Sequence, residues 1–290
     1  MHVPVLTEKV IEYLNVKSNR NFIDCTLGSG AHTSAIVKHN RPAGKVLAID
    51  WDREAITRAR SVLSKPDLRR ITFVEDNFSH LEDITKREKF HASGVLLDLG
   101  MSSDQLELSK RGFSFQKNEP LDMRYSLENP LTAAKIVNYW SKNDITRMLK
   151  EYGQEQFANQ IAEAITKERK EHAIARTQEL VKVITGAVPG WYRRRKIHPA
   201  TKTFQALRIE VNNELENLKA VIPQVFRVLG AGGRVVIISF HSLEDRIVKY
   251  AFKENPQAKI LTKKVIIPSI VERETNPRAR SAKLRAAEKL

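Results

Sequence analysis

The sequence has little cysteine and no long apolar segment. A single cysteine, Cys25, excludes an internal disulfide and leaves no partner cysteines for a zinc site. No apolar run in the 290 residues is long enough to cross a bilayer, so no membrane partner is expected. The first residues, MHVPVLTEKV, lack the basic segment, apolar core and cleavage site of an export signal. These absences predict a globular protein of a reducing compartment, with a cytoplasmic location.

Acidic residues are scarce relative to basic ones. The chain has 49 Lys and Arg against 34 Asp and Glu, a formal net charge of +15, which favours a polyanionic partner. The excess is concentrated in residues 191–202, WYRRRKIHPATK, and in the last residues, NPRARSAKLRAAEKL. For either cluster the alternative is a solvated basic face.

Short β-branched runs followed by helix-like stretches predict an α/β fold with a parallel sheet covered by helices. The runs cover residues 22–25, 45–49, 71–75, 94–99 and 234–239. A long gap precedes the last run, and its apolar residues recur at helical spacing, which predicts a small all-helical domain at 104–202 inserted between two parts of the sheet domain, 1–103 and 203–290. A further helical stripe runs from Val211 to Leu229 and ends at a glycine cluster.

A glycine loop follows the first predicted strand in FIDCTLGSGAH, residues 22–32. Such a loop places backbone N–H groups and a helix N-terminus against a ligand. A phosphate-binding P-loop would need a lysine, which GSGAHT lacks, and a dinucleotide fingerprint would need a third glycine where Thr33 stands. The carboxylate of Asp24 would repel a pyrophosphate but suit the ammonium of a methionine moiety. The loop therefore points to S-adenosylmethionine.

Further candidate ligand residues follow the next strands. Asp50 ends the second strand, where an acid accepts hydrogen bonds from ribose hydroxyls. This feature does not distinguish S-adenosylmethionine from a dinucleotide, because both contain a ribose. Phe78 follows the third strand and is placed either to stack on adenine or to pack in the core. Asp98 and Gln105 lie in or after LLDLGMSSDQ, at the carboxyl edge where parallel sheets bind ligands. A helix-capping or solvated carboxylate is the alternative for Asp98.

Several longer stretches are specific enough to resemble a known family. They are HVPVL at the N-terminus, RGFSFQKNEPLDMR (111–124), HPATKTFQALRIEVNNEL (198–215), ISFHSLEDRIVK (238–249) and NPRARSAKLRAAE (276–288). Together they resemble the MraW family of bacterial ribosomal RNA methyltransferases, also called RsmH, over essentially the whole chain. The resemblance implies a Rossmann-like class I methyltransferase sheet with a helical domain inserted after the fourth strand. It also implies methylation by S-adenosylmethionine of the N4 amine of a cytosine in the decoding region of 16S rRNA, within the small ribosomal subunit.

The resemblance assigns cofactor contacts residue by residue. They fall on Gly30, Ala31, His32, Asp50, Phe78, Asp98 and Gln105. The loop departs from the family pattern at Ala31, where glycine is usual, and a methyl group there disfavours a positive φ. The residues expected to line the RNA side of the cleft are His198, Lys202, Arg208, His241 and Arg246. Such contacts give affinity rather than sequence specificity.

The expected chemistry needs an acceptor near the cytosine amine. Many amino methyltransferases use an Asp/Asn-Pro-Pro-aromatic motif, but this chain has DLGMSS, so Asp98 is a hypothesis for the catalytic role. The same carboxylate could instead hold the ammonium of the cofactor. Methylation at ring C5 through an enzyme thiolate is disfavoured, because the chain has only Cys25 and lacks a two-cysteine arrangement for covalent attack on the ring. No metal is expected, since His198, His241 and Glu244 lack metal-ligand spacing.

Two functions of other classes remain as alternatives. A dehydrogenase could use the same sheet, although Asp24 and Thr33 count against it. A non-catalytic RNA-binding module would need the basic clusters but not the acids at the sheet edge. Cofactor binding would separate the three functions. The sequence leaves the oligomeric state open, with a homodimer among the options.

Overall fold

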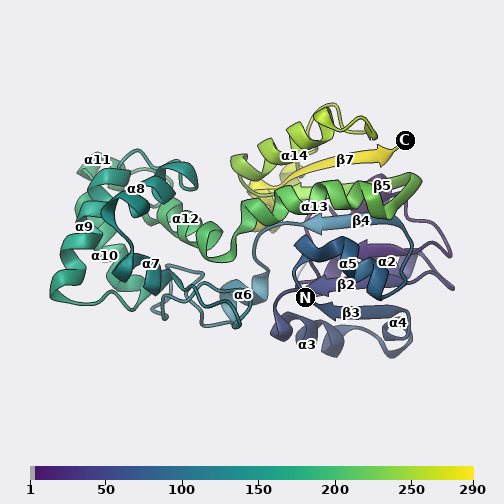
Figure 1. Cartoon of the computed structure of the whole chain (residues 1–290), viewed down its shortest axis with the longest axis horizontal. Coiled ribbons are helices and arrows are strands. Elements are labelled where there is room, and N and C mark those ends of the chain that lie inside the picture. Colours follow the sequence, from purple (N-terminus) through teal and green to yellow (C-terminus); the bar gives the residue numbers. More distant parts are fainter. Residues whose placement is uncertain (1–3) are drawn as a thin grey trace. The chain divides into compact units, whose positions relative to one another are not determined.

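The computed structural model describes residues 4–290, without the side chains of residues 103 and 104, and divides into two compact units (Figure 1). The sheet unit runs up to Ser102 and resumes from Leu215 to Leu290, and the helical unit covers Ser103–Glu214. The helical unit thus extends beyond residue 202, the predicted end of the insert. Helix α12 (Ala200–Asn212) accounts for the difference, because it packs on other helices of this unit.

The sheet unit is built on seven strands in the order β3-β2-β1-β4-β5-β7-β6. The strands are β1 (Phe22–Asp24), β2 (Val46–Asp50), β3 (Ile71–Glu75), β4 (Ala92–Asp98), β5 (Leu229–Ser239), β6 (Ala258–Ile260) and β7 (Lys283–Lys289). The first five strands pair in parallel, whereas β7 is antiparallel to both β5 and β6. The predicted α/β class is confirmed, and the carboxyl ends of β1, β2, β3 and β4 share one edge of the sheet.

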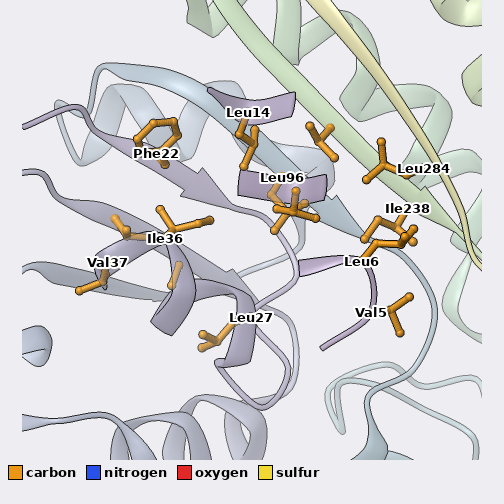
Figure 2. Packing of buried hydrophobic residues seen from close by; sticks show 14 of the residues in the cluster. Val5, Leu6, Leu14, Phe22, Leu27, Ile36, Val37, Leu96, Ile238 and Leu284 are labelled. Atoms are coloured by element: carbon orange, nitrogen blue, oxygen red, sulfur yellow. The ribbon is translucent and has the colours of Figure 1, made fainter. Parts of the chain in front are cut away.

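Alternation along the strands directs side chains into two separate cores. In β2, Val46 and Ala48 face one core, and Leu47 and Ile49 face the other. Helices α1 (Thr7–Leu14), α2 (Ala31–His39) and α3 (Arg53–Val62) cover the first face, and α5 (Leu81–Arg87), α13 (Glu214–Val228) and α14 (Ser242–Glu254) cover the second. Figure 2 shows side chains from α1, α2, β4, β5 and β7 gathering in the first core. Burial on both faces explains why these strands are continuously apolar rather than alternating in polarity.

Several helices of the sheet unit begin at a residue whose side chain caps them. Asp52 precedes α3 and accepts a hydrogen bond from the backbone N–H of Glu54, a typical N-cap contact. The helices are α1 (Thr7–Leu14), α2 (Ala31–His39), α3 (Arg53–Val62), α4 (Lys65–Leu68), α5 (Leu81–Arg87), α13 (Glu214–Val228), α14 (Ser242–Glu254) and α15 (Ile270–Thr275).

The helical unit contains the remaining α-helices. They are α6 (Ser103–Glu107), α7 (Ala133–Tyr139), α8 (Lys142–Glu151), α9 (Ala158–Glu171), α10 (Thr177–Ala187), α11 (Gly190–Arg193) and α12 (Ala200–Asn212). Helix α9 packs on α7, α8 and α10. Every helix within residues 4–290 is too short or too polar to span a bilayer.

One sequence prediction differs from the observed elements, and part of one basic segment forms a strand. The helical stripe from Val211 to Leu229 is interrupted at Asn213, which has a φ of 51° and ends α12 before α13 begins. The basic tail, predicted as a cluster that favours a polyanion, includes strand β7, whose Leu284 and Ala286 are buried in the sheet. Arg285 of the same strand is paired with Asp245 at 2.7 Å.

Candidate active site

The glycine loop joins β1 to α2. Gly28 and Gly30 have φ angles of 52° and 77°, in the left-handed region that favours glycine. A Cβ atom at Gly30 would lie 3.1 Å from the Cβ of Ala59, so both space and backbone conformation require glycine there. Ala31 is the first residue of α2 and is not among the residues with positive φ. The departure from the family pattern therefore falls on a helical residue, where a methyl group is accommodated.

Asp24 at the end of β1 holds this loop in place. Its Oδ2 accepts a hydrogen bond from the Thr33 hydroxyl at 2.7 Å, and its Oδ1 accepts one from the Thr26 N–H at 3.1 Å. The side chain has no exposed surface, and this burial raises its pKa. The carboxylate of Asp24 was expected to suit the ammonium of a ligand, and in the structure it forms these two hydrogen bonds within the loop. Its contact with an ammonium stays a prediction. Thr26 and Thr33 were overlooked as partners of this carboxylate, although an aspartate side chain often accepts from the backbone N–H two residues further on, as it does here from Thr26.

Asp50 links the end of β2 to the same loop. Its two carboxylate oxygens accept hydrogen bonds from the backbone N–H groups of Gly28 and Asp52, each at 2.8 Å. Burial raises the pKa of Asp50 to about 6. Each oxygen has a second lone pair, so the carboxylate can fix the loop and still accept hydrogen bonds from ribose hydroxyls.

Asp98 and His32 form the least satisfied part of the site. The backbone N–H of Asp98 donates to the Thr26 hydroxyl at 2.7 Å, which fixes the end of β4 against the loop. Asp98 Oδ2 lies 3.4 Å from His32 Nε2. Among the residues that the structure describes, Asp98 Oδ1 and both ring nitrogens of His32 are buried without a hydrogen-bond partner. Buried polar atoms of proteins are normally paired, so this group of atoms is suited to a ligand.

The electrostatics of this cluster favour a positively charged ligand. Burial acts to lower the pKa of His32, but the neighbouring Asp98 and Asp24 carboxylates outweigh it and the pKa is raised. Asp50 adds a third carboxylate within the same loop network. A sulfonium or an ammonium group would be attracted here, whereas a pyrophosphate would be repelled.

Phe78 follows β3 at the same edge of the sheet. The backbone N–H of Asp76 donates to the Asp50 carbonyl at 3.1 Å, so the ends of β2 and β3 lie side by side. The Phe78 ring is half-buried and packs against the second core. The contacts described so far bring together the ends of four strands and, with them, the predicted ligand residues Gly30, Ala31, His32, Asp50, Phe78 and Asp98.

The predicted site residues of the helical unit make their own local contacts. Gln105 is buried in α6. His198 stacks on Phe115 with ring centroids 4.9 Å apart, and its Nδ1 accepts from the backbone N–H of residue 200. Lys202 donates to the Gln154 carbonyl at 2.7 Å. His198 and Lys202 thus each have a structural contact in the absence of RNA.

The other predicted RNA-binding residues differ in how available they are. Arg208 is bonded to both carboxylate oxygens of Glu214, at 2.8 and 3.0 Å, and this nearly buried pair leaves the guanidinium little free surface. His241 caps α14, where its Nδ1 accepts from the Glu244 N–H at 3.3 Å. Arg246 is exposed on α14. Of these residues, Arg246 is the one whose charge is presented to solvent.

Comparison with known proteins supports the family resemblance that the sequence motifs indicate. The model of the MraW methylase family matches residues 1–290. A protein from Dehalococcoides mccartyi named ribosomal RNA small subunit methyltransferase H is 44% identical over all of this chain and 86% of its own length. Proteins of the same name from Symbiobacterium thermophilum and Clostridium botulinum are 41% and 42% identical, over 96% and 99% of their lengths.

A solved structure supports the fold. A Clostridium thermocellum protein provisionally named an rRNA methylase covers all of both chains with a TM-score of 0.50 and 12% sequence identity. At that identity the likeness concerns the fold alone. The sequence relatives confirm the predicted resemblance. Because the family model also matches the full length, the chain belongs to the MraW methylase family.

Proposed function

We propose that this protein transfers a methyl group from S-adenosylmethionine to the N4 amine of a cytosine in the decoding region of 16S rRNA. Support comes from membership of a methylase family and from relatives that are named ribosomal RNA small subunit methyltransferase H. N4 methylation of cytosine is the activity known for that family. Membership of a methylase family also speaks against the dehydrogenase and the non-catalytic module as alternatives.

The observation that carries the proposal is the set of buried, unpartnered polar atoms of His32 and Asp98 beside the glycine loop. Gly30, Ala31 and His32 would lie along the methionine part of the cofactor, and Asp50 would accept from its ribose. Phe78 is half-buried, so its free face could pack on adenine. Gln105 is the remaining proposed contact. The carboxylates of this site fit a ligand that carries a sulfonium and an ammonium group.

For this reaction the protein has to position the cytosine amine against the methyl group and accept one proton. Bound S-adenosylmethionine supplies a methyl group already activated on sulfur. The lone pair of the cytosine amine is delocalised into the ring, so a hydrogen bond from that amine to Asp98 would favour the pyramidal geometry that attacks. The amine must then lose a proton, and the Asp98 carboxylate, with His32 at 3.4 Å, is placed to accept it.

The substrate side of the proposal rests on charge. The formal net charge of +15 suits a large folded RNA, and Arg246, His198, Lys202, Arg208 and His241 stay proposed RNA contacts. Arg208 and His241 would first have to leave their acidic neighbours Glu214 and Glu244, so we expect them to contribute less than Arg246. The homodimer and the cytoplasmic location stay predictions.

The decisive experiment supplies labelled S-adenosylmethionine and isolated small ribosomal subunits, followed by digestion of the RNA and mass spectrometry. Label on cytosine N4 is the expected result. Label found only on ring C5, on a ribose oxygen or on protein would contradict the proposal. Protein that has been treated with a chelator and then freed of it should transfer methyl groups unchanged in the same assay, which tests the prediction that no metal ion is required.

A further inference from the structure

Three aromatic rings meet at one surface of the helical unit. Trp191 and Tyr192 belong to α11, and Phe157 immediately precedes α9. Ring centroids lie 5.8 Å apart for Phe157 and Trp191, 5.7 Å for Trp191 and Tyr192, and 4.9 Å for Phe157 and Tyr192, all with edge-to-face geometry. Tyr192 is buried, whereas Trp191 is 54% exposed. The indole is therefore supported from within the protein and open to solvent.

A buried carboxylate fixes the base of this cluster. Glu155 is 3% exposed, and its Oε2 accepts a hydrogen bond from the Tyr192 hydroxyl at 2.8 Å. Its Oε1 accepts from the Phe157 backbone N–H at 2.9 Å, so one carboxylate joins the two segments that carry the rings. Burial and this hydrogen bond raise the pKa of Tyr192 to about 12. The support under Trp191 is thus preorganised, and little ordering is needed when a ligand binds.

Basic residues follow the exposed indole in the sequence. Arg193, Arg194, Arg195 and Lys196 are all exposed, and within residues 4–290 none of them forms an ion pair with a carboxylate. The Arg195 guanidinium lies 5.8 Å from the centroid of the Trp191 ring and 5.3 Å from that of Tyr192. We name residues 191–196 the aromatic–basic surface. Cations without acidic partners beside an exposed aromatic ring are the two components of a single-strand nucleic-acid site.

We propose that Trp191 stacks on an unpaired base of the RNA substrate while the neighbouring cations bind the phosphates on either side of that base. The inference rests on the proposed function for the identity of the RNA. A protein partner fits less well, because a run of four exposed cations without acids would meet its complement in a phosphate backbone. Stacking needs only the face of a base, so the contact would add affinity without reading sequence.

Binding of protein-free 16S rRNA to Trp191→Ala and Trp191→Phe tests the proposal. We expect about tenfold weaker binding for Trp191→Ala, the order of one stacked base, with the dependence of affinity on salt unchanged because stacking releases no counterions. Trp191→Phe keeps a ring and should retain most of the affinity. The matched control is Tyr139→Ala, which removes a more exposed ring, 81% exposed, from the same unit and should bind as the wild type does.

Tryptophan fluorescence gives a second readout. The chain has three tryptophans, so the signal of Trp191 is the difference between wild type and Trp191→Phe. A short single-stranded RNA should quench that signal, whereas heparin, a polyanion without bases, should not. Equal quenching by heparin, or wild-type binding by Trp191→Ala with unchanged thermal unfolding, would overturn the stacking contact. A loss of affinity of Trp191→Ala for assembled subunits but not for protein-free rRNA would also overturn it, since that pattern indicates that Trp191 contacts a ribosomal protein.

The same variants separate this inference from the function on which it rests. If wild type methylates cytosine N4 and Trp191→Ala binds RNA normally, only the stacking contact fails. If wild type methylates no ribosomal RNA but Trp191→Ala still loses affinity and quenching, the stacking contact stands and the proposed function fails.

Discussion

The glycine-loop site and the aromatic–basic surface differ in whether their charged groups are buried or exposed. At the glycine loop Asp24 is fully buried, Asp50 holds backbone N–H groups, and polar atoms of His32 and Asp98 lie buried without partners. At the aromatic–basic surface the charges of residues 193–196 are exposed and have no carboxylate partners among the described residues. The charged groups of the glycine-loop site are largely buried, whereas those of the aromatic–basic surface are exposed to solvent.

The difference predicts how each region responds to solution conditions. Desolvated groups have shifted pKa values and strong, geometry-dependent interactions, so the glycine-loop site should respond to pH and to single-atom changes. Exposed charges are screened by salt, so the aromatic–basic surface should respond to ionic strength. Experiments that vary pH and ionic strength separately therefore test whether the two regions differ in this way.

The largest effect should come from Asp98→Ala in the glycine-loop site. Removal of the proposed acceptor should lower single-turnover methyl transfer to small subunits by about a hundredfold or more, a usual range for proton-transfer groups. The control is Asp83→Ala, which removes an exposed carboxylate from α5 and should leave transfer unchanged.

Cofactor binding to the same variant separates two roles of Asp98. If calorimetry shows normal binding of S-adenosylmethionine while transfer falls, Asp98 acts on the transition state. If binding is lost in proportion, Asp98 anchors the cofactor. Full transfer by Asp98→Ala would remove the residue from the site and weaken the contrast between the two regions.

A smaller effect is expected at Asp50. Asp50→Ala should weaken S-adenosylmethionine binding by about 1 to 3 kcal/mol, because the N–H groups of Gly28 and Asp52 lose their acceptor. The pKa of Asp50, about 6, is raised above its unfolded value of about 3.9, so between these values the folded state holds more protons. The Asp50 contribution to the free energy of unfolding therefore falls as pH rises through this window.

Ligand binding should show the opposite trend. Ribose hydroxyls donate to the ionised carboxylate, so affinity should rise with pH up to about 6 and then level off, and Asp50→Asn should flatten that rise. Calorimetry at several pH values measures this. Comparison with S-adenosylhomocysteine, which keeps the ammonium but lacks the sulfonium charge, isolates the effect of His32 protonation on the sulfonium, since the two ligands differ in charge at that group alone. An equal pH profile for wild type and Asp50→Asn would contradict the role of Asp50.

The sequence revealed those parts of the site that depend on strand ends. Asp50 and Asp98 were found because β-branched runs mark strands, and parallel strands bring their carboxyl ends to one edge. The hydrogen bond from Thr33 to Asp24 was not predicted, because Thr33 lies nine residues further on and was considered only as the position where a dinucleotide fingerprint would have a glycine. Nothing in local sequence reports whether a carboxylate faces a ligand or a neighbouring hydroxyl.

Contacts across the junction between two helices were also not predicted. The pair of Arg208 and Glu214 forms where Asn213 adopts a left-handed conformation, at a point where the apolar pattern suggested the start of a continuous helix. The strand β7 has the sequence KLRAAEK, whose residues favour helices, and it becomes a strand because β5 offers an edge to pair with. Tertiary pairing outweighs local propensity in this segment.

At the aromatic–basic surface, replacement of Arg193, Arg194 and Arg195 by glutamine should weaken RNA binding mainly at low salt. Loss of three phosphate contacts should reduce the slope of log affinity against log salt by about 2, on a scale of about 0.7 per phosphate of single-stranded RNA. Cofactor binding should not change. An unaltered slope would mean that this cluster is a solvated face, and an altered cofactor affinity would contradict the separation of the two regions.

The smallest effect is expected for Ala31→Gly, which restores the residue usual in the family to the glycine loop. Ala31 is the first residue of α2, so glycine there gains no needed conformation and loosens the first turn of the helix. The free energy of unfolding should fall by about 1 kcal/mol or less, with S-adenosylmethionine affinity unchanged. Gly30→Ala is the matched contrast, because it forces a positive φ and a 3.1 Å contact with Ala59. It should destabilise by more, about 1 to 2 kcal/mol from the backbone alone, and weaken cofactor binding as well. Denaturant unfolding and calorimetry on both variants measure these effects. If Ala31→Gly instead tightened cofactor binding, the loop would need a glycine at both positions, and the conformation described for residues 28–31 would not be the one that binds the cofactor.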